Sequence, residues 1–308
     1  MEVNSLSDFR SGFATLVGRP NVGKSSLINA IMGEKISIIS NKPQTTRHQI
    51  RCIYSAEGAQ IVFVDTPGLL RRPRHKLGEF MVDEAVRSLE GVDVVCYVVE
   101  AGDREICEDD MAIVEILRKT PTPVFLVVNK IDLLQKKGSF WHAVALYQDL
   151  VKPKEVVPVS AVTGTNLDIL IEKIISYLPP QPPLYPEDIV TDKDERFIAA
   201  ETIREKIFLL TGEEVPYSVT VDVEEYKSPE EYPDRKAVYI RATIYVERDG
   251  QKAIIIGSGG KMLKEIGRLA REELEFKLGH KVYLELWVKV RPHWRKSERE
   301  LRRLGYRA

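Results

Sequence analysis

A short glycine-containing segment near the N-terminus constrains the fold of this chain more than any other feature. The segment is Gly18-Arg19-Pro20-Asn21-Val22-Gly23-Lys24-Ser25, and it lies between the apolar run Phe13–Val17 and the helix-like stretch Ser26–Met32. Glycines let the backbone curl so that several N–H groups converge on phosphate oxygens, and the following helix start adds partial positive charge. This order of strand, GxxxxGK(S/T) loop and helix predicts a P-loop nucleotide-binding domain.

Further apolar runs predict the sheet of that domain. They are rich in valine and isoleucine, as expected of strands buried on both faces of a parallel sheet: Ile61–Val64, Val92–Val99, Val124–Val128 and Val156–Val159. Stretches with helical spacing lie between them: Leu77–Leu89, Met111–Leu117 and Leu167–Leu178. The alternation predicts a doubly wound, mostly parallel α/β domain over residues 1–180.

A proline-rich stretch marks the end of this domain. Five prolines occur within residues 178–188, and they can neither continue a helix nor enter a central strand. We expect a stiff linker over 181–191. The pattern then changes to a smaller α+β unit over 192–308, with a helix, two strands, a mostly helical region and a last strand: Phe197–Leu210, Tyr217–Val223, Ala237–Val246, Ile254–Leu278 and Val282–Val290.

Composition narrows the class of protein. The length of 308 residues suits two domains, and no apolar run reaches the roughly eighteen residues of a membrane span. The N-terminus lacks the pattern of a secretory signal, and three cysteines without metal-like spacing favour a reducing cytoplasm. Net charge is −1, yet residues 251–308 carry 15 basic and 7 acidic residues, a balance of +8. This basic end indicates either an anionic partner or a solvated tail.

The segment Asn129-Lys130-Ile131-Asp132 indicates which base the P-loop domain binds. The segment follows an apolar strand, and ligands of open α/β sheets bind at such strand ends. The Asp132 carboxylate only accepts hydrogen bonds, which suits the N1–H and N2–H₂ donors of guanine, whereas adenine has no matching donor pair. The Lys130 stem can cover the ring and Asn129 can brace the loop. Ser160-Ala161, after the next strand, could offer backbone N–H groups to the guanine O6.

Two other segments are expected to sense the phosphates. Asp65-Thr66-Pro67-Gly68 follows an apolar strand, so that Asp65 would hold Mg²⁺ through water and the Gly68 N–H would meet the γ-phosphate. The polar stretch before it contains Thr45-Thr46-Arg47, and one threonine could reach Mg²⁺ only when the γ-phosphate is present. We choose Thr46 over Thr45, and both could instead simply belong to a mobile loop.

The C-terminal unit contains an apolar helical turn, a glycine loop and a basic amphipathic helix, IIIGSGGKMLKEIG. This order resembles a KH domain, and the preceding helix and two strands resemble its bacterial type II form. In such domains the loop brings N–H groups close to the phosphates of about four single-stranded nucleotides. The predicted RNA-binding residues are Ile256, Gly257, Ser258, Gly259, Gly260, Lys261, Lys264, Arg268, Arg291 and Arg295. Trp287 and Trp294 could stack on bases or pack the domain.

Five guanine-nucleotide motifs thus occur in one order: GRPNVGKS, TTR, DTPG, NKID and SA. With its C-terminal unit, the chain resembles the Era-type family of translation-factor-related bacterial GTPases over essentially its whole length. The resemblance implies GTP and GDP with Mg²⁺ as ligands, binding of 16S rRNA near its 3′ end, and a role in assembly of the small (30S) ribosomal subunit. It also implies a cytoplasmic location, in part on the inner face of the membrane, and no DNA partner.

The resemblance implies these nucleotide-binding residues: Gly18, Arg19, Pro20, Asn21, Val22, Gly23, Lys24, Ser25, Ser26, Asp65, Thr66, Pro67, Gly68, Asn129, Lys130, Asp132, Ser160 and Ala161. Within the set, Ser25, Asp65 and Thr46 are the expected Mg²⁺ ligands, and Lys24, Asn21, Gly68 and Thr46 the expected catalytic residues.

The position after DTPG is Leu69, where many GTPases have a glutamine that orients water. Because leucine cannot hydrogen-bond, hydrolysis must recruit another group. In similar GTPases an asparagine at the position of Asn21 is associated with a bound K⁺ that neutralises charge between the β- and γ-phosphates. Asn21 could instead only stabilise the loop. Two other functions stay open: a non-catalytic RNA-binding module, and a membrane-associated regulatory GTPase whose RNA binding is secondary.

Overall fold

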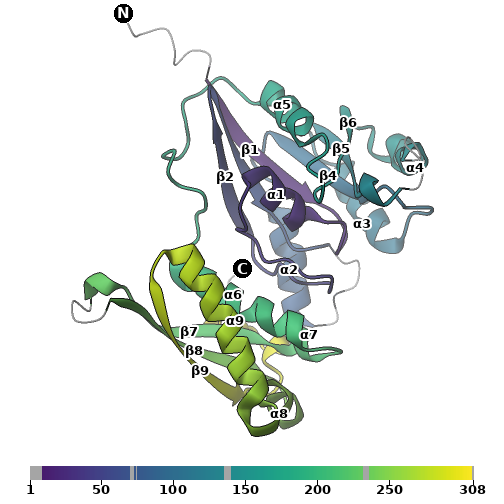
Figure 1. Ribbon diagram of the computed structural model, residues 1–308. Coiled ribbons are helices and arrows are strands. Elements are labelled where there is room, and N and C mark those ends of the chain that lie inside the picture. Colours follow the sequence, from purple (N-terminus) through teal and green to yellow (C-terminus); the bar gives the residue numbers. More distant parts are fainter. Residues whose placement is uncertain (1–8, 70–72, 74, 135–139, 232–235, 307–308) are drawn as a thin grey trace, which may run out of the picture. The chain divides into compact units, whose positions relative to one another are not determined.

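The computed structural model describes residues 9–69, 73, 75–134, 140–231 and 236–306 (Figure 1). The chain forms two compact units, the first chiefly residues up to Asp192 and the second chiefly residues from Lys193 onward. Each unit is described by itself.

The first unit is built on a six-stranded sheet in the order β2-β3-β1-β4-β5-β6. All neighbours run parallel except β2, which is antiparallel to β3, so the expected mostly parallel sheet is confirmed. The strands are β1 (Arg10–Val17), β2 (Ile50–Ala56), β3 (Ala59–Asp65), β4 (Val94–Glu100), β5 (Val124–Asn129) and β6 (Glu155–Pro158). Strand β2 lies at an edge and alternates between buried and exposed residues, which left it without the continuous apolar pattern of the others.

Helices cover both faces of this sheet. They are α1 (Lys24–Met32), α2 (Lys76–Arg87), α3 (Glu108–Leu117), α4 (Trp141–Val151) and α5 (Leu167–Tyr177). Tyr97 of β4 joins the buried cluster with α3 and α4 on one face, and Phe125 of β5 packs its ring on Tyr177 of α5 on the other. Burial on both faces explains why the strand sequences are continuously apolar.

The proline-rich stretch packs along the first unit instead of standing free. Ser11 Oγ donates to Pro182 O at 2.7 Å, and the Gln60 side chain donates to Tyr185 O at 2.9 Å. A bridge between Cys52 and Thr191 continues the contact. The prolines therefore give this stretch an extended course that the edge of the unit can hold.

Apart from the short helices α7 (Val215–Ser218) and α10 (Glu298–Arg303), the second unit has the order helix–strand–strand–helix–helix–strand that the KH resemblance implied. Its other elements are α6 (Glu195–Leu210), β7 (Thr220–Lys227), β8 (Ala237–Val246), α8 (Asp249–Ile256), α9 (Lys261–Leu278) and β9 (Lys281–Val290). The sheet order is β7-β8-β9, with β8 and β9 parallel. Ile207 of α6, Ile244 of β8 and Ile266 of α9 meet in its core.

The first strand of this unit starts later than its sequence pattern suggested. We expected it from Tyr217, but residues Val215–Ser218 form a helical turn with Pro216 as its second residue, and β7 begins at Thr220. Proline suits the first turn of a helix because its missing N–H has no partner there. Among the described residues, no helix is both long and apolar enough to cross a membrane.

Candidate nucleotide and RNA sites

The candidate nucleotide site is a cavity of about 440 Å³ at the carboxyl ends of the parallel strands. It is lined by Thr46 and by every predicted nucleotide-binding residue except Gly18, Arg19, Val22, Asp65, Pro67 and Ser160. Most of these six lie behind the wall and act on residues that form it, as the contacts below show. Tertiary folding therefore brings together segments that are more than one hundred residues apart.

Two backbone carbonyls of the P-loop hold its lysine in place. Lys24 is the first residue of α1 and is buried, and its Nζ donates to Gly18 O at 2.9 Å and to Arg19 O at 3.1 Å. Burial lowers the pKa of Lys24 to about 8, and the nearby Asp65 opposes that shift. The first N–H groups of a helix have no partner within it, so the start of α1 adds donors and positive potential beside the lysine.

Two glycines are required by close approach. A Cβ at Gly23, where φ is +95°, would collide with the amide nitrogen of Asn129. A Cβ at Gly68 would lie 2.8 Å from backbone atoms of Pro20, so DTPG can pass against the P-loop only with a glycine there. The two positions let the phosphate-binding segments pack against each other.

Three side-chain oxygens meet beside the P-loop. Ser25 Oγ donates to Asp65 Oδ2 at 2.7 Å and lies 2.9 Å from Thr46 Oγ1. Within the part of the chain that the structure describes, no group hydrogen-bonds the buried Asp65 Oδ1, and burial raises the pKa of Asp65. Hydroxyl and carboxylate oxygens are the ligands Mg²⁺ prefers, and a cation would give the under-partnered carboxylate a counter-charge. These residues fit a Mg²⁺ ion.

The two threonines of the polar stretch Ser40–Gln49, the expected switch segment, point to different partners. Thr46 Oγ1 lies near Ser25, as above, whereas Thr45 Oγ1 donates to Lys42 O at 2.7 Å within its own loop. This difference favours Thr46 over Thr45 as the ligand that would report on the γ-phosphate.

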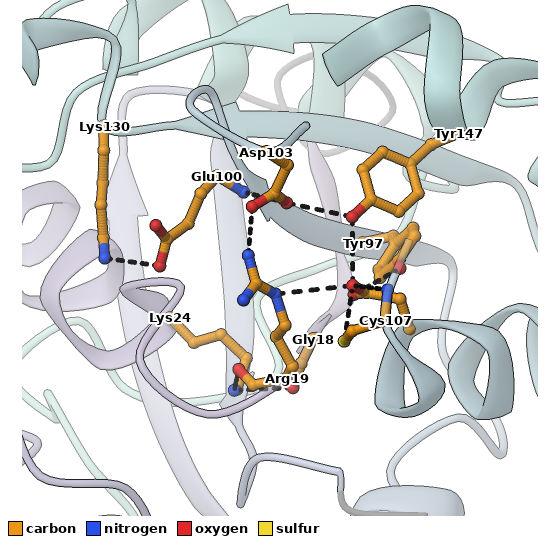
Figure 2. Close-up of polar contacts among 10 residues, drawn as sticks. Gly18, Arg19, Lys24, Tyr97, Glu100, Asp103, Cys107, Lys130 and Tyr147 are labelled. Atoms are coloured by element: carbon orange, nitrogen blue, oxygen red, sulfur yellow. Dashed lines mark hydrogen bonds and ion pairs between the residues drawn. The ribbon is translucent and has the colours of Figure 1, made fainter. Parts of the chain in front are cut away.

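The predicted base-recognition segment is tied to the P-loop. Asn129 Nδ2 donates to Val22 O at 2.9 Å, and its Oδ1 accepts from Ala161 N at 3.2 Å. Lys130 Nζ donates to Asn21 O and pairs with Glu100, both at 2.7 Å, the latter drawn in Figure 2. Asn129 thus braces both neighbouring loops, and Lys130 is held over the cavity by its two partners.

The remaining wall of the cavity surrounds Asp132. Its carboxylate accepts a hydrogen bond from Ser160 Oγ at 2.6 Å, so Ser160 acts through Asp132. Leu133 and Val162 also line the cavity and are 72 % and 84 % exposed. Exposed apolar side chains beside a base-recognition carboxylate can sandwich a purine ring. We did not predict these two residues, and their only signal in the sequence is that each directly follows a motif.

Asn21 and Leu69 differ in what they offer to catalysis. The Leu69 side chain is buried in the core of the first unit and cannot orient water. Asn21, in the left-handed region with φ of 69°, donates from its Nδ2 to Asn41 O at 3.2 Å. The P-loop asparagine thus faces a backbone carbonyl of the switch segment across the cavity that both residues line.

The candidate RNA site is a groove of about 600 Å³ between α9 and β9. Its lining includes Gly260, Lys261, Lys264 and Arg268 on the helix side and Leu284 on the strand side. The preceding loop needs positive φ angles at Gly257, Gly259 and Gly260, so only glycines suit it. Arg268 is paired with Glu265 and Glu272 at 2.7 Å each, and it would have to exchange these partners for a phosphate.

Two predicted RNA-binding arginines lie outside this groove. Arg291 pairs with Glu300 at 3.0 Å and lies 4.5 Å above the ring of Tyr245, and Arg295 forms an ion pair with Glu247. Trp294 is buried, with its Nε1 donating to Ser218 O at 2.9 Å, so it packs the domain, whereas Trp287 is 53 % exposed.

Models of two known families match the chain. A family described as 50S ribosome-binding GTPase matches residues 13–130, and the KH domain family matches residues 214–295. GTPase Era of Geobacter metallireducens is 50% identical over 302 residues, which cover 98% of this chain and 99% of that protein.

Two solved structures are similar over both units. A single-site variant of Aquifex aeolicus Era bound to GDP·AlF₄⁻ has a TM-score of 0.92, and Era in complex with MgGDPNP and nucleotides 1506–1542 of 16S ribosomal RNA has a TM-score of 0.90. Each is 41% identical, and the match covers 97% of this chain and 100% of that one.

Proposed function

Because the chain belongs to the Era family of GTPases, we propose that it hydrolyses GTP in the P-loop cavity and binds 16S rRNA near its 3′ end in the α9–β9 groove. In this role it acts in assembly of the small (30S) ribosomal subunit. The observation that carries the proposal is the meeting of Lys24, the Ser25–Asp65–Thr46 oxygens and Asp132 around one cavity. A separate unit that carries the GxxG groove supports the RNA part.

The residues of the cavity divide the work. Lys24 and the start of α1 bind the β- and γ-phosphates and stabilise the charge that develops on them, and Gly68 brings its N–H to the γ-phosphate. Ser25, Thr46 and Asp65 would hold Mg²⁺, which when bound neutralises phosphate charge. Asp132 accepts hydrogen bonds from guanine, and Lys130 covers the ring.

Phosphate release tests the proposal directly. We expect the full chain to release phosphate from GTP in many turnovers with Mg²⁺, slowly alone and faster with an RNA that covers the 3′ end of 16S rRNA. ATP should be a poor substrate because Asp132 finds no donor pair on adenine. A chain that binds GTP and RNA but releases phosphate at most once would instead be a non-catalytic RNA-binding module, in which bound nucleotide only sets the conformation. Equal binding of ATP and GTP would contradict the site.

We propose a K⁺ ion beside Asn21, because the amide oxygen of Asn21 and the backbone carbonyl of Asn41, which line the same cavity, are both suitable ligands once the hydrogen bond from Asn21 Nδ2 to Asn41 O opens. We expect GTP turnover in K⁺ buffer to exceed that in Na⁺ buffer, and the Asn21→Ala variant to lose the difference. Equal rates in the two buffers would remove this part of the proposal.

We also propose a cytoplasmic location, with a fraction of the molecules bound at the inner face of the membrane. The +8 balance of residues 251–308 supports contact with anionic lipid, as it supports contact with RNA. Flotation with anionic and with neutral vesicles tests this, with and without competing RNA. No flotation with either vesicle would leave RNA as the partner of the basic end.

A further inference from the structure

The arginine of the P-loop turns away from the nucleotide cavity. Arg19 belongs to the loop, yet it does not line the cavity. Figure 2 shows its guanidinium directed at Asp103, with which it forms an ion pair, and its Nε lies 3.6 Å from Asp110. Asp103 lies in the connection from β4 to α3, and Asp110 lies in the first turn of α3. The loop is therefore anchored to a segment that contributes nothing to the cavity wall.

The anchor is itself held firmly. Tyr147 Oη lies 3.0 Å from Asp103 Oδ2 and 3.1 Å from Asp110 Oδ2, and Tyr97 Oη donates to Asp110 Oδ1 at 3.1 Å. Asp110 also accepts from Cys107 Sγ at 3.0 Å. Figure 2 shows Tyr97 and Tyr147 on the far side of this cluster from Lys24. Asp110 is almost fully buried and has these three side-chain donors besides Arg19.

Asp103 depends more on the arginine. Burial raises the pKa of the Asp103 carboxyl, and the charge of Arg19 opposes that rise. Its other donors are the Tyr147 hydroxyl and, at 3.3 Å, the backbone N–H of Glu100. Removal of the guanidinium would leave a largely buried carboxylate without its counter-charge and the loop without its side-chain anchor.

The anchor reaches the phosphates through the backbone. The carbonyl of Arg19 is one of two that Lys24 Nζ grips, and the neighbouring Asn21 carbonyl is held by Lys130. A shift of the Arg19 backbone would therefore move the acceptor that orients Lys24. Small displacements of an orienting group lower binding and rate without removing any group that touches the ligand.

We propose that Arg19 is a positioning residue of the nucleotide site, whose ion pair with Asp103 anchors the P-loop and so orients Lys24 toward the phosphates. This inference rests on the proposed GTP site. It differs from the expectation that Arg19 itself binds nucleotide, because Arg19 acts through Asp103 and the loop backbone.

A double-mutant cycle in the full chain tests the proposal. We expect Arg19→Gln and Asp103→Asn each to raise the Kd for GDP about tenfold, and the double variant to be no weaker than the weaker single variant. Arg19→Lys should recover part of the affinity, because an ammonium can pair with Asp103 but cannot fork toward Asp110. The ratio of affinities for GDP and inosine diphosphate (IDP) should stay at the wild-type value. The two ligands share their phosphates and differ only in the amino group that Asp132 recognises, so a change at the phosphate end affects both equally.

The matched control is Arg118→Gln, which removes an arginine that links α3 to Leu150 O at 2.9 Å without contacting the P-loop. Its Kd should not change. A purely structural role for Arg19 would lower the melting temperature and the number of sites per chain while the remaining sites kept their Kd. That result, additive effects in the cycle, or wild-type affinity in Arg19→Gln would overturn the proposal. Failure of the wild-type chain to bind GDP would instead overturn the proposed function.

Discussion

Asp132 illustrates how much of the candidate chemistry rests on single side chains. It lines the cavity, and within the described residues its one hydrogen-bond donor is the Ser160 hydroxyl, so carboxylate lone pairs remain for a base. Thr46 and Arg19 depend on side-chain direction in the same way. The Thr46 hydroxyl is turned toward Ser25, and the Arg19 guanidinium is turned toward Asp103. At this scale, the proposed role of each residue depends on the direction of its polar side-chain atoms.

The Asp132→Asn variant tests base recognition. We expect GTP affinity to fall about 100-fold, because an amide nitrogen would face the guanine donors and two charge-assisted hydrogen bonds are lost. Xanthosine triphosphate, which has an oxygen in place of the amino group, should become the preferred substrate. Competition binding measures both values, and Asp168→Asn, at an exposed position on α5, is the control. Retained GTP selectivity in Asp132→Asn would contradict the assigned role.

Thiol reactivity tests burial at the residue level. Burial raises the pKa of Cys96 to about 12, so at pH 8 only about one thiol in ten thousand is ionised, and its side chain is inaccessible. Cys52 is equally buried, whereas Cys107 is partly exposed. We expect a disulfide reagent at pH 8 to label Cys107 slowly and the other two only after denaturation. Fast labelling of Cys96 in the native protein would show that β4 is not covered on both faces.

At the scale of elements, the N-terminal ends of two helices form parts of both candidate phosphate-binding sites. The first turn of α1 faces the nucleotide cavity, and the first turn of α9 follows the glycine loop at the RNA groove. In both cases a glycine in the left-handed region precedes a lysine that begins the helix: Gly23 before Lys24, and Gly260 before Lys261. The same device, N–H donors with a positive side chain, suits phosphate in a nucleotide and in an RNA backbone.

The two ends of α9 provide a matched test of the RNA groove. Gly260 and Gly279 flank the helix with φ of +78° and +67°, and both have open space where a Cβ would stand. Gly260→Asp and Gly279→Asp should therefore cost about the same stability, about 1 kcal/mol each. Only Gly260→Asp places a carboxylate in the groove, so RNA affinity should fall at least about tenfold by like-charge repulsion.

Fluorescence anisotropy with a single-stranded RNA measures this difference, and GDP binding should be normal in both variants. Equal losses of RNA affinity in Gly260→Asp and Gly279→Asp would mean that stability, and not the loop, controls binding. Unchanged affinity in Gly260→Asp would remove the groove as the RNA site.

At the scale of the whole molecule, two units with separate cores each carry a site for one anionic ligand, the nucleotide in the first unit and RNA in the second. Residues 251–308 carry a balance of +8, and the rest of the chain carries 30 basic and 39 acidic residues, a balance of −9. The nucleotide site lies in the acidic part and depends on a few aimed groups, whereas the RNA groove lies in the basic part. Long-range attraction should therefore matter for RNA and much less for GTP.

Salt dependence tests this division. If about four phosphates are neutralised in the groove, the logarithm of RNA affinity should fall with the logarithm of salt concentration with a slope of about −3. GDP affinity with Mg²⁺ in the same buffers should change far less. Lys264→Gln should make the RNA slope shallower by about 0.7. A slope near zero would mean that RNA binds through contacts other than the basic groove.

The sequence by itself determined the P-loop, the mostly parallel sheet and the helix and strand order of the second unit, because glycine placement and hydrophobic periodicity are local properties. It did not reveal the edge strand β2 or helix α4, whose patterns are mixed. Only the tertiary structure decided that Thr46 meets Ser25, that the proline-rich stretch packs on the first unit, and that Arg19 faces Asp103. Each of these depends on partners distant in the chain, such as residues 19 and 103, and no local pattern encodes the direction of a side chain toward them.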